Sequence, residues 1–361
     1  MSVRRRGSSL LVPAALLLLT TAPAAAAAPR PTPLDTGLLS PLSVSVAADG
    51  GVWYSENYAG LLHHRAANGR VTTPARAPGD LELSAVSELD GTVWYAVTGA
   101  GHTVGKLHEL DPDGSGHLTD TVVTDLFAHE RRTNPDHAFS YGFRHLPRAC
   151  AARLPRGGRA AYRGRAETHP VASLPAHGAL YLADAAANAV TAVVDGTPTT
   201  VAVLPPVRTT MTRRYAEAND FPGCTVGRDY WAEAVPTDVE EGPDASLYVT
   251  SLPGGPGDVD GAPAGRLLRI MILTGQVTVV AHGLDTPVGV AVSDAGDLYV
   301  SELQADRISR IAAGTGTAAP YARMKFPGDV EWTPDGLVVT TDVLSGTNGV
   351  DPPDGSLVRL E

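Results

Sequence analysis

Short apolar runs rich in β-branched and aromatic residues recur along this chain of 361 residues. Six of them share one pattern: GVWYSE (51–56), TVWYAV (92–97), ALYLAD (179–184), SLYVTS (246–251), DLYVSE (297–302) and GLVVTT (336–341). A second short run, usually introduced by proline, precedes each one, as in PVGVAV from Pro287. Between the two runs stand turn sequences such as Asp90-Gly91 and Asp335-Gly336, whose residue types favour tight hairpins. The pattern therefore predicts a series of β-hairpins.

Further strand-like runs follow each hairpin, as in GRLLRIM (265–271), QVTVVA (276–281), DRISRI (306–311) and SLVRLE (356–361). Six copies of a four-stranded antiparallel meander predict an all-β, six-bladed β-propeller over residues 29–361, because radial closure buries both faces of each small sheet. The sixth copy stops at Glu361 after three strands. We therefore expect the N-terminal segment at about 33–39 to supply the outer strand of the last blade.

Two stretches break the repeat, at about 125–168 and 205–234. We expect these insertions to hold short helices around 125–132 and 211–219, and each carries one of the two cysteines, Cys150 and Cys224. In an oxidising compartment an even cysteine count favours one disulfide, which would join the insertions over one face. Two separate buried thiols are the alternative.

The first 28 residues have the organisation of an export signal. Three arginines (4–6) precede an apolar stretch (10–19) and an alanine-rich run ending at Ala28. This order is typical of a cleaved signal peptide and predicts a secreted, extracytoplasmic protein, with a retained anchor as the alternative. The general secretory route and the twin-arginine route both stay open. No later run of apolar residues is long enough to span a bilayer, so no stable membrane span is expected after cleavage.

The charge balance argues against a general nucleic-acid binder. Asp and Glu number 39 against 28 Lys and Arg, for a formal net charge of -11. Such a chain lacks the basic surface that neutralises phosphates. The expected partner is an unknown small molecule or another extracytoplasmic protein.

Aligning the repeats predicts a candidate binding rim. The innermost strand of each blade begins on the same face where the next strand ends, because the two are antiparallel. This places several polar side chains around one opening: Ser43, Glu56, Asp184, Asp238, Glu302 and Asp329. This rim is the candidate ligand-binding site.

Three of these carboxylates suggest a metal site. Asp238, Glu302 and Asp329 would offer the oxygen ligands that Ca²⁺ prefers, and calcium is the one cofactor the sequence suggests. His169, just before the third repeat, joins them as a catalytic candidate that would move protons. The alternative is that these residues are structural or merely exposed.

The repeat segments resemble a known family. The stretches PVGVAVSDAGDLYVSELQADRISRI, VPTDVEEGPDASLYVTSLPGG, HPVASLPAHGALYLADAAANAV and TDLFAHERRTNPD are similar to those of ScyD/ScyE proteins, which are related to NHL-repeat, SMP-30/gluconolactonase and streptogramin-lyase propellers. The resemblance spans nearly the whole mature chain. It implies an exported six-bladed propeller with no assigned enzymatic activity.

Three functions follow as hypotheses, and whether the chain is an enzyme stays open. The first is a binding scaffold that holds a ligand or protein on the acidic rim. The second is a calcium-dependent lactonase or esterase of the SMP-30 type. The third is a streptogramin-type C–O lyase, for which the later repeats show no matching His and Glu pair.

Overall fold

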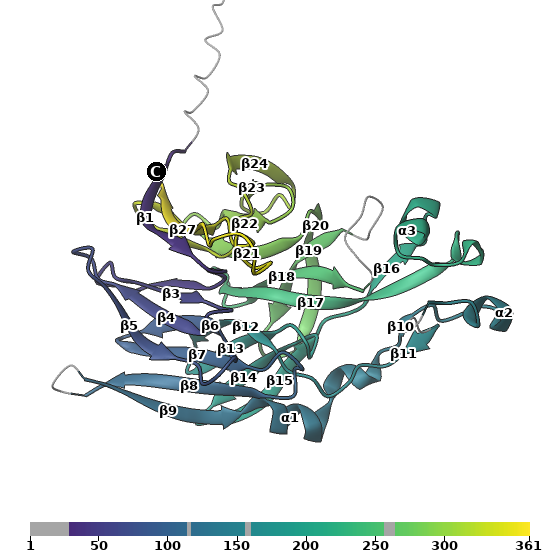
Figure 1. Cartoon of the computed structure of the whole chain (residues 1–361), viewed down its shortest axis with the longest axis horizontal. Coiled ribbons are helices and arrows are strands. Elements are labelled where there is room, and N and C mark those ends of the chain that lie inside the picture. The colour runs from purple at the N-terminus through teal and green to yellow at the C-terminus, as the bar shows by residue number, and fades with distance from the viewer. Residues whose placement is uncertain (1–28, 114–116, 156–159, 256–263) are drawn as a thin grey trace, which may run out of the picture.

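The computed structural model describes residues 29–113, 117–155, 160–255 and 264–361, so the signal peptide expected at 1–28 lies outside the described residues. Antiparallel sheets dominate the chain (Figure 1). The first is formed by β2 (Val44–Val46), β3 (Val52–Glu56), β4 (Leu61–Arg65) and β5 (Val71–Arg76). The second is formed by β6 (Glu82–Leu89), β7 (Thr92–Thr98), β8 (Gly105–Pro112) and β9 (Leu118–Asp125).

The remaining sheets follow in chain order. The third consists of β12 (Pro170–Ala176), β13 (Ala179–Asp184), β14 (Ala189–Val194) and β15 (Thr197–Val203). The fourth is built on β17 (Asp229–Glu241), β18 (Leu247–Gly254), β19 (Gly265–Met271) and β20 (Gln276–Leu284). The fifth consists of β21 (Pro287–Val292), β22 (Leu298–Glu302), β23 (Arg307–Ile311) and β24 (Ala318–Arg323).

The sixth sheet joins the two ends of the described chain. Its strands are β25 (Val330–Thr333), β26 (Gly336–Thr341), β27 (Gly355–Leu360) and, outermost, β1 (Pro31–Leu38). β1 runs antiparallel to β27 from Pro31 opposite Leu360 to Leu38 opposite Gly355. Figure 1 shows β1 beside the C-terminus. The expected closing strand is therefore confirmed.

The sheets are arranged radially. Their first strands contact one another in cyclic order, from β2 through β6, β12, β17, β21 and β25 and back to β2. The buried apolar clusters lie between neighbouring sheets: Leu62 of the first sheet packs in one cluster with Tyr95 of the second, and Tyr54 of the first packs with Val338 of the sixth. This confirms the all-β propeller, and it places the starts of the first strands around a central channel.

The hairpin turns follow the local sequence. Asp90 and Gly91 both have positive φ (53° and 90°) between Leu89 and Thr92, which face each other in β6 and β7. This is the two-residue loop geometry that Asp-Gly favours, because glycine and short polar residues tolerate left-handed backbone.

Both insertions attach to the fourth sheet. The first holds α1 (Leu126–Thr133), the 3₁₀ helix Pro135–Ala138, β10 (Tyr141–Gly142), α2 (Arg148–Ala151) and β11 (Ala161–Tyr162). The second holds β16 (Val207–Thr210), α3 (Arg213–Ala218) and the 3₁₀ helix Gly223–Thr225. The expected helices are present, and in addition β10 and β16 both pair with β17.

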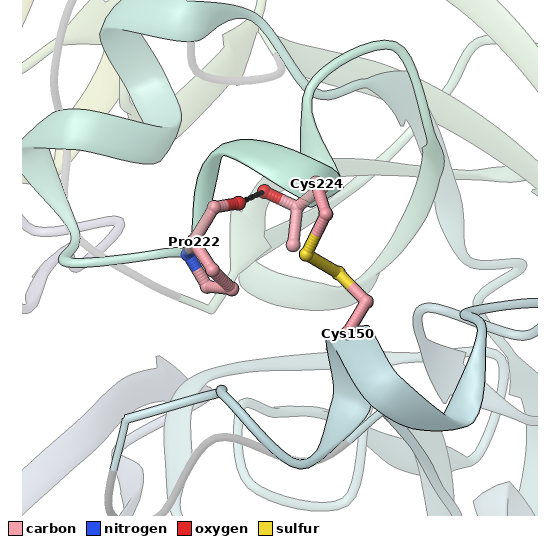
Figure 2. Close-up of a disulfide and its surroundings, with 4 residues drawn as sticks. Cys150, Pro222 and Cys224 are labelled. Carbon is pink, nitrogen blue, oxygen red and sulfur yellow. Dashed lines mark hydrogen bonds between the residues drawn. A yellow bond between two sulfur atoms is a disulfide. The ribbon is translucent and has the colours of Figure 1, made fainter.

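A disulfide joins the insertions, as predicted. Cys150 on α2 and Cys224 are bonded across 74 residues of sequence (Figure 2). In Figure 1, α2, β10 and α3 project together to one side of the sheets. No helix in the described part of the chain is long and apolar enough to cross a membrane.

Candidate channel-mouth site

All six sheets meet at a small pocket of about 120 Å³. Its lining residues come from the beginnings of the first strands and from adjacent loops: Leu42, Asn57, Tyr58, Glu82, His169, Val171, Thr237, Val288 and Gly328. Because these positions surround the axis of the propeller, the pocket is the mouth of the central channel. Its wall is largely apolar, with a few convergent polar groups, which is the usual composition of a ligand site.

A histidine–carboxylate pair is the chemical centre of this mouth. His169 Nε2 lies 3.1 Å from Glu82 Oε2, and both side chains are about one-fifth exposed, at 22% and 20%. The neutral imidazole that donates from Nε2 to Glu82 keeps Nδ1 as an acceptor. Such a pair can orient a polar group or take up a proton from it.

Neighbouring groups fix this pair. The backbone amide of His169 donates to Asp184 Oδ1 at 2.7 Å, and the ring stacks on His102 with centroids 4.9 Å apart. Tyr58, 53% exposed, stands at the edge of the mouth, where burial and then the Glu82 carboxylate raise the pKa of its phenol. The sequence pointed to His169, but Glu82 was missed because it lies 87 residues away in the previous repeat.

The rim residues at the starts of the first strands brace neighbouring sheets. Ser43 Oγ accepts the Val86 amide at 2.8 Å, which links the first sheet to the second. Asp238 and Asp329 act in the same way, as acceptors for the amides of the next first strand along the ring: Val290 at 2.6 Å and Val44 at 2.8 Å. All three side chains are buried. Their polar atoms thus satisfy backbone donors that would otherwise be unpaired.

The rim residues at the ends of the second strands do not reach the opening. Glu56, Asp184 and Glu302 accept the amides of Leu39, His169 and Asp285, which lie just before the first strand of the same sheet. Each carboxylate therefore fixes the segment that enters its own sheet. The pairing of Pro287 with Glu302 places the end of β22 beside the start of β21, but none of the three carboxylates lines the channel-mouth pocket.

Glu302 is the most strongly held of these groups. Its side chain is fully buried, and Arg307 donates to it from Nε at 2.8 Å and from Nη2 at 2.9 Å. Burial alone would raise the pKa of Glu302, but hydrogen bonds from Arg307, the Asp285 amide and Ser309 outweigh it and lower the pKa. The carboxylate is held as an anion beside Arg307, and Glu302 does not line the channel-mouth pocket.

Deeper in the channel lies a group of four carboxylates, which we call the channel quartet: Asp238, Glu240, Asp329 and Glu331. One Asp-Val-Glu triplet lies in β17 and the other begins one residue before β25, and alternation of side chains puts the Asp and Glu of each triplet on the same face. Burial, and then the other three carboxylates, raise the pKa of Glu331 well above its usual range. The pKa of Glu240 rises to about 8 for the same reason, with Asp329 as the main neighbour.

The fifth sheet leaves room for the quartet. At the position equivalent to Asp238 and Asp329, β21 carries Gly289. A Cβ there would lie 2.9 Å from the Gly328 carbonyl oxygen and 2.8 Å from Ser301 Oγ, so only glycine lets β25 approach this closely. The carboxylates of the two triplets can therefore interact electrostatically across β21, which lies between β17 and β25.

Of the calcium ligands expected from the sequence, Asp238 and Asp329 lie close together, but Glu302 does not join them. Glu302 is committed to Arg307 inside its sheet, while Asp238 and Asp329 each accept two backbone amides. Within the described ranges, no group of three or more His, Cys, Asp or Glu side chains has an arrangement that could hold a metal ion. The donor set of Asp238, Glu302 and Asp329 therefore does not fit Ca²⁺, which needs six or more oxygens around one point.

Comparisons with known proteins give structural likenesses only. No protein-family model matches the chain, and neither does any curated protein. A catalytically inactive virginiamycin B lyase from Staphylococcus aureus, solved with quinupristin, is 15% identical with a TM-score of 0.51, over 92% of this chain and 99% of that one. The aldose sugar dehydrogenase from Streptomyces coelicolor, in its PQQ-bound form, is 15% identical with a TM-score of 0.52, over 91% of this chain and 97% of that one. A luciferin-regenerating enzyme is 10% identical with a TM-score of 0.55, over 92% of this chain and 95% of that one.

These likenesses extend over almost the full length of both chains, so they establish the propeller fold independently of the repeat argument. At such low identity they show the fold alone, because one propeller scaffold carries many unrelated chemistries. Function must therefore be argued from the channel mouth itself.

Proposed function

We propose that this protein is a secreted, six-bladed propeller that binds a small compound with a hydroxyl or carbonyl group at its channel mouth. The six sheets serve as the six blades, and the fourth carries both insertions. The observation that carries the proposal is the Glu82–His169 pair at 3.1 Å in a pocket to which all six sheets contribute.

The surroundings of the pair favour binding as its role. Val171 and Val288 provide apolar contact, while Thr237 and the imidazole provide polar contacts. The Thr237 hydroxyl already donates to the Pro287 carbonyl at 2.8 Å, so its lone pairs are what it can offer a ligand. The repeat segments that resemble the ScyD/ScyE family, the disulfide and the expected signal peptide support an extracytoplasmic location.

The test uses the mature chain, residues 29–361, and two probes of suitable size, γ-butyrolactone and methyl lactate. Ligand-observed NMR should show saturable binding of at least one probe. His169→Asn and Glu82→Gln should weaken it about tenfold or more, since each removes one partner of a hydrogen-bonded pair. His177→Asn is the matched control, because His177 forms a similar 3.0 Å pair with Glu241 at a more exposed position.

Saturable binding that is lost in the two mouth variants and kept in the control supports the proposal. Absence of binding of both probes, or equal binding by all variants, overturns it. Both results are interpretable only if the variants melt like the parent, which circular dichroism will show.

Hydrolysis or lyase chemistry is the second candidate, and the same histidine–carboxylate pair favours it. In lactone hydrolysis His169 would take a proton from the attacking water and return it to the alkoxide as the ring C–O bond breaks; in an elimination it would take the C–H proton as the C–O bond breaks. Turnover of γ-butyrolactone that His169→Asn abolishes would favour this candidate. Running the assay with added Ca²⁺ and with EDTA tests the metal-dependent version, for which Asp238, Glu302 and Asp329 were the expected ligands.

A further inference from the structure

A second and larger pocket lies between the two insertions, away from the channel mouth. It has a volume of about 410 Å³, and we call it the insertion pocket. Its lining residues that matter here are Asp136, Tyr162, Asn188, Phe221, Tyr230 and Glu233. They come from the first insertion, the loop after β13, the second insertion and β17, so the pocket exists because the insertions are held together.

The floor of the insertion pocket holds buried oxygen atoms that have no partner. Asp136 and Asn188 are each only 1% exposed, and the Asn188 amide group donates to Asp136 Oδ2 at 2.9 Å. The other oxygen of each side chain, Asp136 Oδ1 and Asn188 Oδ1, accepts no hydrogen bond. A buried polar atom without a partner costs about 1–3 kcal/mol, so two together at a cavity call for donors from a ligand.

The chain keeps this floor in place. Gly164 packs directly on the Asp136 carboxylate, and a Cβ at position 164 would overlap Asp136 Oδ1. The Tyr141 hydroxyl donates to Asp136 Oδ2 from 3.4 Å. Behind Asp136, the Glu130 side chain is 2% exposed and has an unpaired Oε2 as well. The region is therefore rich in acceptors and poor in donors.

The walls combine aromatic rings with weakly charged groups. Phe221 and Tyr230 lie with ring centroids 6.5 Å apart, and Tyr162 approaches Tyr230 and Glu233 closely. Burial raises the pKa of Asp136 to about 6 and raises that of Glu233, which disfavours their charged forms. Three carboxylates, of Asp136, Glu167 and Glu233, and two exposed arginines, Arg163 and Arg165, line the pocket, so opposite charges nearly balance across it. The pocket therefore suits a neutral ligand better than a cation.

We propose that the insertion pocket binds a neutral polyhydroxylated compound of monosaccharide size, whose hydroxyl groups donate to Asp136 Oδ1 and Asn188 Oδ1. The rings of Phe221, Tyr162 and Tyr230 cover its apolar face. Aromatic faces beside carboxylate and amide oxygens match a sugar ring, which alternates apolar C–H faces with hydroxyl edges. This site is separate from the channel mouth, so neither proposal depends on the other.

The experiment is calorimetry and ligand-observed NMR on the mature chain. D-glucose, D-mannose and myo-inositol are the polyol probes, and putrescine is the cationic probe. At least one polyol should bind saturably with a Kd of about 1 mM or tighter, and putrescine should not. Asp136→Asn should weaken binding about tenfold, because it replaces an acceptor by a donor of the same shape.

One further variant and two controls complete the experiment. Tyr162→Leu, which removes one aromatic face, should weaken binding about threefold without changing Asp136 or Asn188, and it remains informative if Asp136→Asn does not fold. Asp195→Asn, in an exposed turn, and His177→Asn, in the pair with Glu241 outside both pockets, should leave the affinity for polyols unchanged. Binding of putrescine alone, binding of no probe, or equal polyol affinity in both pocket variants and the parent would overturn the proposal.

Discussion

Neutralising the channel quartet should stabilise the protein at neutral and alkaline pH. The perturbation is Glu240→Gln combined with Glu331→Gln, which keeps the shape of both side chains and removes two charges. Neither side chain is needed as an acceptor for the amide of a neighbouring sheet, unlike Asp238 and Asp329. The double variant therefore tests the electrostatics without breaking the braces between sheets.

The magnitude follows from the raised pKa of Glu240, about 8 against an ordinary 4.5. The folded protein binds this proton more tightly than the unfolded chain, so stability falls as pH rises from about 4.5 to about 8. A full shift of this size corresponds to roughly 5 kcal/mol at 1.36 kcal/mol per pKa unit. Partial solvent access and coupling within the quartet reduce this, and we expect a gain of roughly 2 kcal/mol at pH 8.

The assay is thermal unfolding at pH 5 and at pH 8. For a chain of this length the gain corresponds to a rise in Tm of roughly 3 °C at pH 8, with little change at pH 5. Glu217→Gln, on an exposed helical position, is the matched control and should change neither value. An equal rise at both pH values would indicate better packing instead of relieved repulsion, and no rise at pH 8 would refute the reasoning.

Three further outcomes are expected from the same structure. Glu302→Gln should cost about 2–4 kcal/mol in urea unfolding, because it leaves Arg307 without its buried counter-charge, and an unchanged midpoint would contradict the structural role. Cys150→Ser, which frees Cys224, should lower stability by roughly 4 kcal/mol at most on the chain-entropy model and expose the insertions to limited proteolysis; protease resistance equal to the parent would argue against the staple. Gly289→Ala should cost about 1–3 kcal/mol through overpacking against β25, and calorimetry that shows no loss would mean that the strands can separate freely.

Most of the fold could be predicted because its information is local. Turn pairs such as Asp90-Gly91 and the alternating runs beside them specify each hairpin within a few residues. Even the long-range pairing of β1 with β27 follows from counting strands, since the last copy lacks one. The disulfide could be predicted because the chain has two cysteines, Cys150 and Cys224, and the expected export signal implies an oxidising compartment.

The candidate site was less accessible from sequence because its members belong to different repeats. Glu82 meets His169 only when the second and third sheets are placed side by side. Asp238 and Asp329 were recognised as important, but a backbone amide from the next sheet was not visible as their partner. One signal was available: the Asp-Val-Glu triplet occurs twice, which places Glu240 and Glu331 on the same strand faces as Asp238 and Asp329.

A general reason connects these results. At three junctions of the ring a short polar side chain accepts an amide of the next first strand: Ser43 from Val86, Asp238 from Val290 and Asp329 from Val44. The polar side chains at these repeated positions are therefore already used in hydrogen bonds that hold the fold together. Residues outside the repeated positions do not hold the next first strand in this way: His169 lies just before a strand, and Asp136 lies in an insertion. In this propeller we therefore expect ligand chemistry where the repeat is broken, at the channel mouth and between the insertions.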